Sequence, residues 1–259
     1  PKGLIAAALA NLGERFGFYT MMAILVLFLQ AKFGMNGKEA GFIYSTFYFS
    51  IYILALVGGI IADKTRNYKG TIFTGIVLMA VGYLLLAIPS KTPVDNKMLY
   101  LVITCASLFV IAFGNGLFKG NLQALVGQMY DNPQYANMRD SGFSLFYMFI
   151  NIGAIFAPFA AVGVRNWWLS TFGYNYDADL PALCHGQLAG TLSPEATETY
   201  HTLVTKASTA PVQDYTAFAS DYLNVFTTGF HYAFGVAIIA MAISLTIYWL
   251  NKKNFPDPS

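Results

Sequence analysis

Charged side chains are scarce in this sequence. Asp, Glu, Lys and Arg make up 11% of its 259 residues, whereas hydrophobic residues make up 56%. Soluble domains average about 25% charged residues. The shortage excludes an ordinary soluble domain and indicates an integral membrane protein in contact with the lipid bilayer. The net charge of +2 is too small to indicate a nucleic-acid partner.

Residues for metal binding and covalent catalysis are also scarce. Cys105 lies in an apolar run and Cys184 in a polar stretch, which gives neither a disulfide framework nor metal-ligand spacing. His185 and His201 have no such spacing with Cys184. The glycine-rich stretch 114–120 lacks the Gly-Lys-Ser/Thr ending of a phosphate-binding loop. We therefore expect no enzyme, no metal and no cofactor.

Long apolar runs are abundant instead. A helix needs about 20 mostly apolar residues to cross a bilayer, and runs this long exclude the alternating strands of a membrane barrel. The sequence therefore predicts an all-α membrane protein with six transmembrane helices. The runs cover residues 4–31, 40–63, 71–89, 98–127, 141–164 and 224–250.

One long polar connector, residues 165–223, separates the last two runs. Ser193, Pro194 and Glu195 have the order of an N-cap, first helical position and first-turn acid, so we expect this connector to be partly helical. The predicted organisation is transmembrane helices 1–5 in residues 1–164, an extracytoplasmic loop in 165–223, helix 6 in 224–251 and the start of a cytoplasmic linker in 252–259. The polar, proline-containing end is typical of a chain cut at a linker.

The distribution of Lys and Arg gives a weak signal for orientation. With a cytoplasmic N-terminus, seven of these residues lie on the cytoplasmic side and six on the other. The positive-inside rule favours this arrangement. We expect a multi-pass protein of the cytoplasmic (inner) membrane.

Three charged residues lie well inside the apolar runs: Glu14, Arg15 and Lys119. Each costs at least about 2.5–3.5 kcal/mol at a helix centre, and such residues usually face a bundle interior or an aqueous cavity. They are therefore functional candidates. The competing interpretation is a membrane scaffold in which these charges are purely structural.

Four predicted helices each have one polar face, because residues three or four apart share a side of a helix. Together these faces could line one wet cavity with a net positive charge, since Glu14 offsets only one of the two cations. Such a cavity suits an anionic group, which Arg can bind bidentately and Lys as a point charge. The faces are Asn11, Arg15 and Tyr19; Tyr44, Tyr48 and Tyr52; Asn115, Lys119 and Gln123; and Asp140, Ser144, Tyr147 and Asn151.

Four segments, in order, resemble the proton-coupled oligopeptide transporter family of the major facilitator superfamily. The first is NLGERFGFYTMMAIL at residues 11–25, which is similar to the family's first-helix signature. GGIIADKTRNYKG at 58–70 resembles the cytoplasmic loop motif between helices 2 and 3. GNGLFKGNLQALVG at 114–127 and FSLFYMFINIGAI at 143–155 resemble the family's fourth- and fifth-helix segments.

The resemblance implies the N-terminal six-helix bundle of a symporter that moves di- and tripeptides with protons by alternating access. It implies that Arg15 and Lys119 hold the peptide carboxylate, and that Tyr19 and Tyr52 line the substrate pocket. The resemblance also implies a hydrogen bond from Asn151 to the peptide near its amino end. The missing partner would be a C-terminal half of six further helices.

The same resemblance implies that Glu14 exchanges salt bridges with Lys119 during proton coupling. It implies that Asp63 and Lys64 belong to a cytoplasmic gate. One departure affects the coupling: Asn11 stands where the family has an additional glutamate. Because Asn11 is neutral and the cavity is positive, a carrier of nitrate or another small anion stays open as an alternative.

Overall fold

The computed structural model describes residues 3–256, and six long helices form its body. All six are long and apolar enough to cross a membrane, which confirms the predicted fold class. The six are α1 (Leu4–Phe33), α2 (Gly37–Thr65), α3 (Tyr68–Ala87), α4 (Lys97–Met129), α5 (Arg139–Thr171) and α8 (Tyr215–Leu250).

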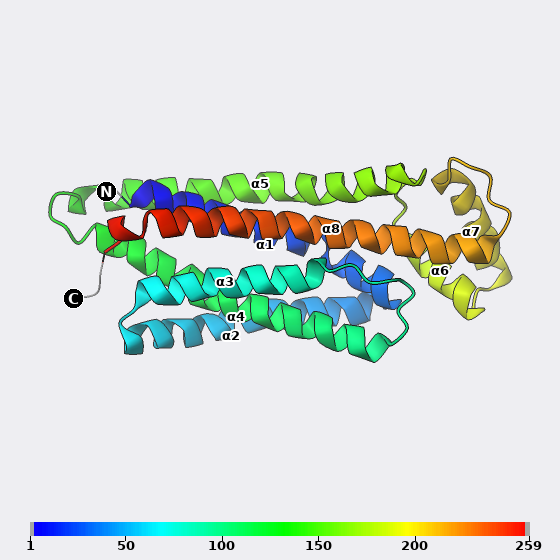
Figure 1. Ribbon diagram of the computed structural model, residues 1–259, viewed down its shortest axis with the longest axis horizontal. Helices are drawn as coiled ribbons and strands as arrows, with labels where there is room; N and C mark the ends of the chain where they lie inside the picture. The colour runs from blue at the N-terminus through cyan, green and yellow to red at the C-terminus, as the bar shows by residue number, and fades with distance from the viewer. Residues whose placement is uncertain (1–2, 257–259) are drawn as a thin grey trace.

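The long helices run side by side along the longest axis of the molecule (Figure 1). Helix α1 packs against α5 and α8, whereas α4 packs against α2 and α3, and contacts between α3 and α8 join the two groups. Two shorter helices, α6 (Leu180–Ala189) and α7 (Pro194–Ala207), gather at one end of the bundle, away from the two chain termini.

Glycines bring α4 close to its neighbours. A Cβ atom added at Gly58 would lie 2.1 Å from the carbonyl oxygen of Gly116, and one added at Gly75 would lie 2.6 Å from that of Gly114. The backbones of α2 and α3 therefore rest directly on α4, as small residues allow in membrane helices. Gly120, further along α4, makes no such contact, because nothing lies within 4 Å of a Cβ atom there.

The helices that flank the long connector extend beyond the boundaries predicted for it. Helix α5 continues to Thr171 instead of ending at 164, and α8 begins at Tyr215 instead of 224. The Asp214 carboxylate caps α8 by accepting hydrogen bonds from the backbone N–H groups of Thr216 (3.1 Å) and Ala217 (3.0 Å). Both helices thus extend past the apolar runs that marked them, and the connector shortens accordingly.

Helices α6 and α7 form a folded cap on this end. Ser193 caps α7 and Pro194 is its first residue, as predicted. The His185 ring lies 2.6 Å from the backbone oxygen of Ala31 at the end of α1, and burial lowers the pKa of His185. Burial likewise raises the pKa of the Cys184 thiol to about 12, so this cysteine is an inert packing residue.

The predicted linker start at 252–259 is described only in part. Residues Lys252–Asn254 form a short 3₁₀ helix, and Phe255 stacks on Tyr248 with ring centroids 5.1 Å apart. Residues 257–259 lie outside the described part of the chain.

Candidate functional site

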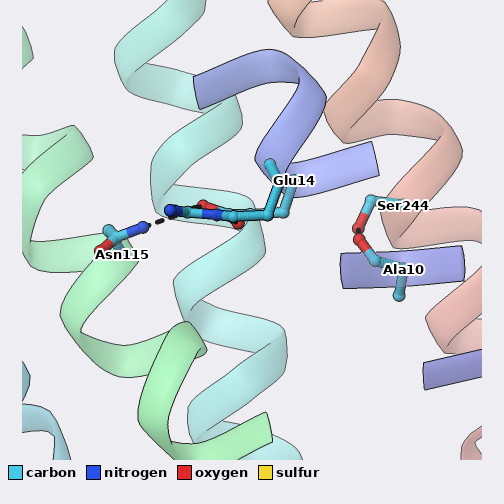
Figure 2. A network of polar contacts seen from close by, with 5 residues as sticks. Ala10, Glu14, Asn115 and Ser244 are labelled. Carbon is cyan, nitrogen blue, oxygen red and sulfur yellow. Dashed lines mark hydrogen bonds and ion pairs between the residues drawn. The ribbon is translucent and has the colours of Figure 1, made fainter. Parts of the chain in front are cut away.

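A buried ion pair lies in the middle of α1. Glu14 is 0% exposed and Arg15 is 4% exposed. The Arg15 guanidinium donates to the Glu14 carboxylate through Nε and Nη2. The amide of Asn115 on α4 donates a further hydrogen bond of 2.9 Å to Glu14 Oε1 (Figure 2). The charged carboxylate is therefore satisfied by a cation and an amide, which is what burial of a charge requires.

Aromatic rings cover the other side of the guanidinium. Arg15 Cζ lies 4.4 Å from the ring centroid of Phe18 and 5.5 Å from that of Tyr19, one helical turn away. Arg binds aromatic faces in this way because its planar cation is weakly hydrated. The rings and Glu14 together hold Arg15 in one place.

Contacts on the opposite side fix α1 itself. Ser244 of α8 donates a 2.7 Å hydrogen bond to the Ala10 carbonyl, as Figure 2 shows beside the ion pair. A Cβ atom added at Gly13 would lie 3.0 Å from the Ala240 carbonyl oxygen, so the two helices are in close contact. The charged face of α1 is thus held toward α4.

A polar cavity of about 290 Å³ lies between α1, α2 and α4. Four of the residues expected from the sequence line it: Arg15, Tyr19, Tyr52 and Lys119. Lys119 is half-buried and comes from the same face of α4 as Asn115. With Tyr48, the cavity therefore brings two cations and three phenol rings to one place, as the spacing by four predicted for three of the four polar faces. The fourth face, on α5, contributes no residue to it.

Helix α2 contributes a ladder of tyrosines to this cavity. The Tyr52 hydroxyl donates to the Tyr48 hydroxyl over 3.1 Å, and the Tyr48 ring stacks on Tyr44 with centroids 6.4 Å apart. Tyr52 is 57% exposed and Tyr48 is 44% exposed. The tyrosine ladder is thus on the open side of the cavity.

Other expected site residues lie elsewhere. Asn151 is exposed on α5 and does not line this cavity. Asp63 and Lys64 are exposed at the end of α2, where the Asp63 carboxylate accepts a hydrogen bond from Tyr68. Within residues 3–256, no ion pair joins Glu14 to Lys119, because Arg15 occupies the carboxylate. The roles expected for these residues stay predictions.

Sequence reasoning missed three buried polar groups. Tyr83 on α3 is fully buried, and its hydroxyl has no hydrogen-bond partner. Lys32, near the end of α1, is 2% exposed. The Nδ1 atom of His231 lies 2.6 Å from the Leu86 carbonyl oxygen, but Nε2 is buried without a partner. A lysine at a predicted helix end or a tyrosine in an apolar run carries no signal of such burial.

Comparison with known proteins identifies the family. A family model described as the POT family matches residues 69–258, which is most of the chain. The chain belongs to the POT family. This confirms the resemblance seen in the sequence motifs, and POT is a family of transporters rather than of enzymes, as expected.

Curated bacterial relatives in this family are about one-third identical to the chain. Dipeptide and tripeptide permease A of Enterobacter sp. (strain 638) is 33% identical over 177 residues, which are 68% of this chain and 32% of the permease. Peptide transporter YePEPT of Yersinia enterocolitica subsp. palearctica serotype O:3 (strain YE-P4) is 34% identical over 181 residues, 68% of this chain and 33% of the transporter. The match thus spans about a third of the length of these relatives.

Solved structures of POT transporters share the fold. A peptide transporter POT in complex with sulfate is 26% identical with a TM-score of 0.63, over 98% of this chain and 38% of that structure. The E310Q mutant of such a transporter in complex with alafosfalin has a TM-score of 0.64 at 26% identity, over 98% and 39%. The six helices therefore have the arrangement of one part of a major facilitator transporter.

Proposed function

We propose that this chain is the N-terminal half of a proton-coupled symporter of di- and tripeptides. The observation that carries the proposal is the polar cavity in which Arg15 and Lys119 face Tyr19 and Tyr52. The names of the relatives, a dipeptide and tripeptide permease and a peptide transporter, support the substrate class. The orientation that goes with this proposal has a cytoplasmic N-terminus in the cytoplasmic membrane.

The two cations suit the carboxylate end of a peptide. Glu14 neutralises one of them, so the cavity keeps one positive charge. Lys119 has no ion-pair partner within residues 3–256 and supplies a point charge at the cavity wall. Arg15 supplies a planar fork that matches the two oxygens of a carboxylate. Tyr19 and Tyr52 add hydroxyl groups for the peptide backbone.

Competition for Arg15 gives a route to proton coupling. Glu14 and the substrate carboxylate both need the Arg15 guanidinium. When substrate takes Arg15, Glu14 is left buried with the Asn115 amide alone. A buried carboxylate without a cation is more stable when it is neutral, so Glu14 takes up a proton. Substrate binding and protonation are thus linked without an acid at Asn11.

The exposed faces of α2 and α5 fit a second half of six helices. In the most apolar stretch of each of these helices, 22% of residues are buried, compared with 61% for α1. Large apolar side chains such as Leu56 (72% exposed) and Phe159 (74%) cover them. Asn151 and the tyrosine ladder lie on the same two helices. A second half packed here would close the cavity and complete the peptide site.

Uptake of labelled dialanine into liposomes that contain the complete carrier tests the proposal. We expect uptake to rise when the outside is made more acidic than the inside, and Lys119→Ala to abolish it. Lys91→Ala, which removes an exposed lysine in the α3–α4 connector, is the matched control and should transport normally. Uptake that ignores the gradient would contradict symport.

Two alternative functions have distinct outcomes in the same assay. If nitrate competes with dialanine, or is itself the only labelled cargo taken up, the protein is a small-anion carrier. If Arg15→Ala and Lys119→Ala leave transport unchanged, the charges are those of a scaffold, and the proposal is wrong.

A further inference from the structure

A second cavity, with mostly apolar walls, lies at the end of the bundle that has α6 and α7. Its volume is about 320 Å³, and its walls come from α1, α3, α4 and α8. Lys32 on its α1 wall lies about 25 Å from Arg15 by the rise of an α-helix, so this cavity is separate from the peptide site. Lys32 is its charged residue, and His231 and Tyr100 are its other titratable residues.

Lys32 is a buried cation without an acid. It is 2% exposed, and its Nζ atom donates a 2.6 Å hydrogen bond to the backbone oxygen of Ser90. Within residues 3–256, no carboxylate forms an ion pair with it. An ammonium group has three donors, and burying its charge is costly unless an anion is near. The site is therefore suited to an anionic acceptor.

His231 lines the same cavity and has one ring nitrogen without a partner. Its Nδ1 atom lies 2.6 Å from the Leu86 carbonyl oxygen, which can only accept, so Nδ1 carries the hydrogen. Charging the ring as well would place a second buried cation beside Lys32. The ring is therefore neutral, and Nε2 is a lone-pair acceptor that is buried without a partner. A fitting ligand has a hydrogen-bond donor at this point.

The mouth of the cavity shows where the ligand comes from. The residues at the edge are apolar and exposed: Leu85 (39%), Ile88 (54%) and Ile103 (40%). Leu85 and Ile103 lie on α3 and α4, and Ile88 is the C-cap of α3, so this edge is not on the α2 and α5 faces assigned to the second half and is left to face lipid. A dissolved solute would have to cross this apolar edge, whereas a lipid already lies against it.

We propose that this cavity binds the head group of a phospholipid that has a donor beyond its phosphate. The phosphate accepts from Lys32, and an N–H or O–H group of the head-group alcohol donates to Nε2 of His231. Ethanolamine and glycerol head groups meet both requirements. Choline meets only the first, because its nitrogen is fully methylated. The proposal is independent of the transported substrate.

Native mass spectrometry of the full-length protein, delipidated in detergent, tests this proposal. The probes are phospholipids with identical acyl chains and ethanolamine, glycerol, N,N-dimethylethanolamine or choline head groups. We expect the first three to be retained about tenfold better than the choline lipid, which is the effect of one hydrogen bond. The dimethyl lipid is the decisive probe, because it keeps one N–H at nearly the size of choline. Equal retention of dimethyl and choline lipids would overturn the proposal.

Two variants assign the contacts. Lys32→Gln should weaken retention of all four lipids, whereas His231→Leu should remove only the preference over choline. Lys91→Gln is the matched control, because it removes an exposed lysine one residue beyond Ser90. If Lys32→Gln and Lys91→Gln give the same retention, the head group does not bind at Lys32. The comparison of lipids on the unchanged protein decides the question even if a variant fails to fold.

Discussion

Two cations are buried on the same helix, and their surroundings differ. Arg15 has a carboxylate beside it, an amide bonded to that carboxylate and two aromatic rings over its face. Lys32 has one backbone carbonyl and a neutral imidazole in its cavity. The first site is satisfied within the protein, whereas the second has an unmatched charge.

This difference predicts two kinds of ligand behaviour. A ligand at Arg15 must displace Glu14, so binding there changes the state of a protein group, as a coupled transporter requires. A ligand at Lys32 displaces no protein group and only adds the missing acceptor. A buried cation can therefore exchange a protein carboxylate for a ligand at one site and hold a ligand permanently at the other.

The largest change in stability should come from removing the anion beside Arg15, which leaves this cation without an acid, as Lys32 is. Glu14→Ala leaves the Arg15 guanidinium buried without its anion, which we expect to cost about 3–5 kcal/mol of stability. Thermal unfolding in detergent measures it, and Glu198→Ala, an exposed acid on α7, is the control. If Glu14→Ala is as stable as the control, Arg15 is not held by this pair.

Removing the amide should have a smaller effect on the same site. Asn115→Ala deletes a 2.9 Å hydrogen bond to a charged acceptor, which is worth about 1.5–3 kcal/mol. Because Arg15 still neutralises Glu14, the loss should stay below that of Glu14→Ala in the same unfolding experiment. A loss as large as that of Glu14→Ala would mean that the amide, not the cation, holds the carboxylate.

The Arg15 site could be predicted from the sequence, because it depends on spacing along helices. Arg15 and Tyr19 are four residues apart on one apolar run, and Lys119 follows Asn115 by four on another. A helix fixes the side on which such residues lie, whatever else packs around it. The six long helices and the cap at Ser193 were predictable for the same reason, since length and local residue type decide them.

The Lys32 site could not be predicted, because it depends on contacts between distant segments. The α3–α4 connector lies over the end of α1, and Ser90 there supplies the acceptor for Lys32. Hydrogen bonds from Thr92 to Asn224 (3.1 Å) and between the Thr92 and Thr227 hydroxyls (2.7 Å) attach this connector to α8. No periodic pattern of residues in the sequence predicts such a contact. The position of Asn151 is a similar case, because spacing along α5 does not show which helices lie next to the face that carries it.

Replacing Lys32 by a neutral residue should raise the stability of the protein, which is the opposite of the effect expected for Glu14→Ala. Lys32→Met keeps the length of the side chain and removes a buried charge without an anion, so we expect delipidated protein to become about 1 kcal/mol more stable. Ser90 is half-buried, so its carbonyl can bond to water instead. Thermal unfolding of delipidated protein measures the change. A loss of stability comparable to that of Glu14→Ala would show that Lys32 is already satisfied within the protein, and the contrast between the two sites would disappear.

The smallest effect should come from the contact that holds α1 behind the Arg15 site. Ser244→Ala removes a 2.7 Å hydrogen bond to the Ala10 carbonyl, and hydrogen bonds between membrane helices average about 0.6 kcal/mol. Gly13 still packs against the Ala240 carbonyl, so the helices should stay in register. We therefore expect a slight loss in thermal unfolding and an unchanged affinity for dialanine. A marked loss of affinity would show that the position of Arg15 depends on α8, and that the Arg15 site is less self-contained than its local contacts indicate.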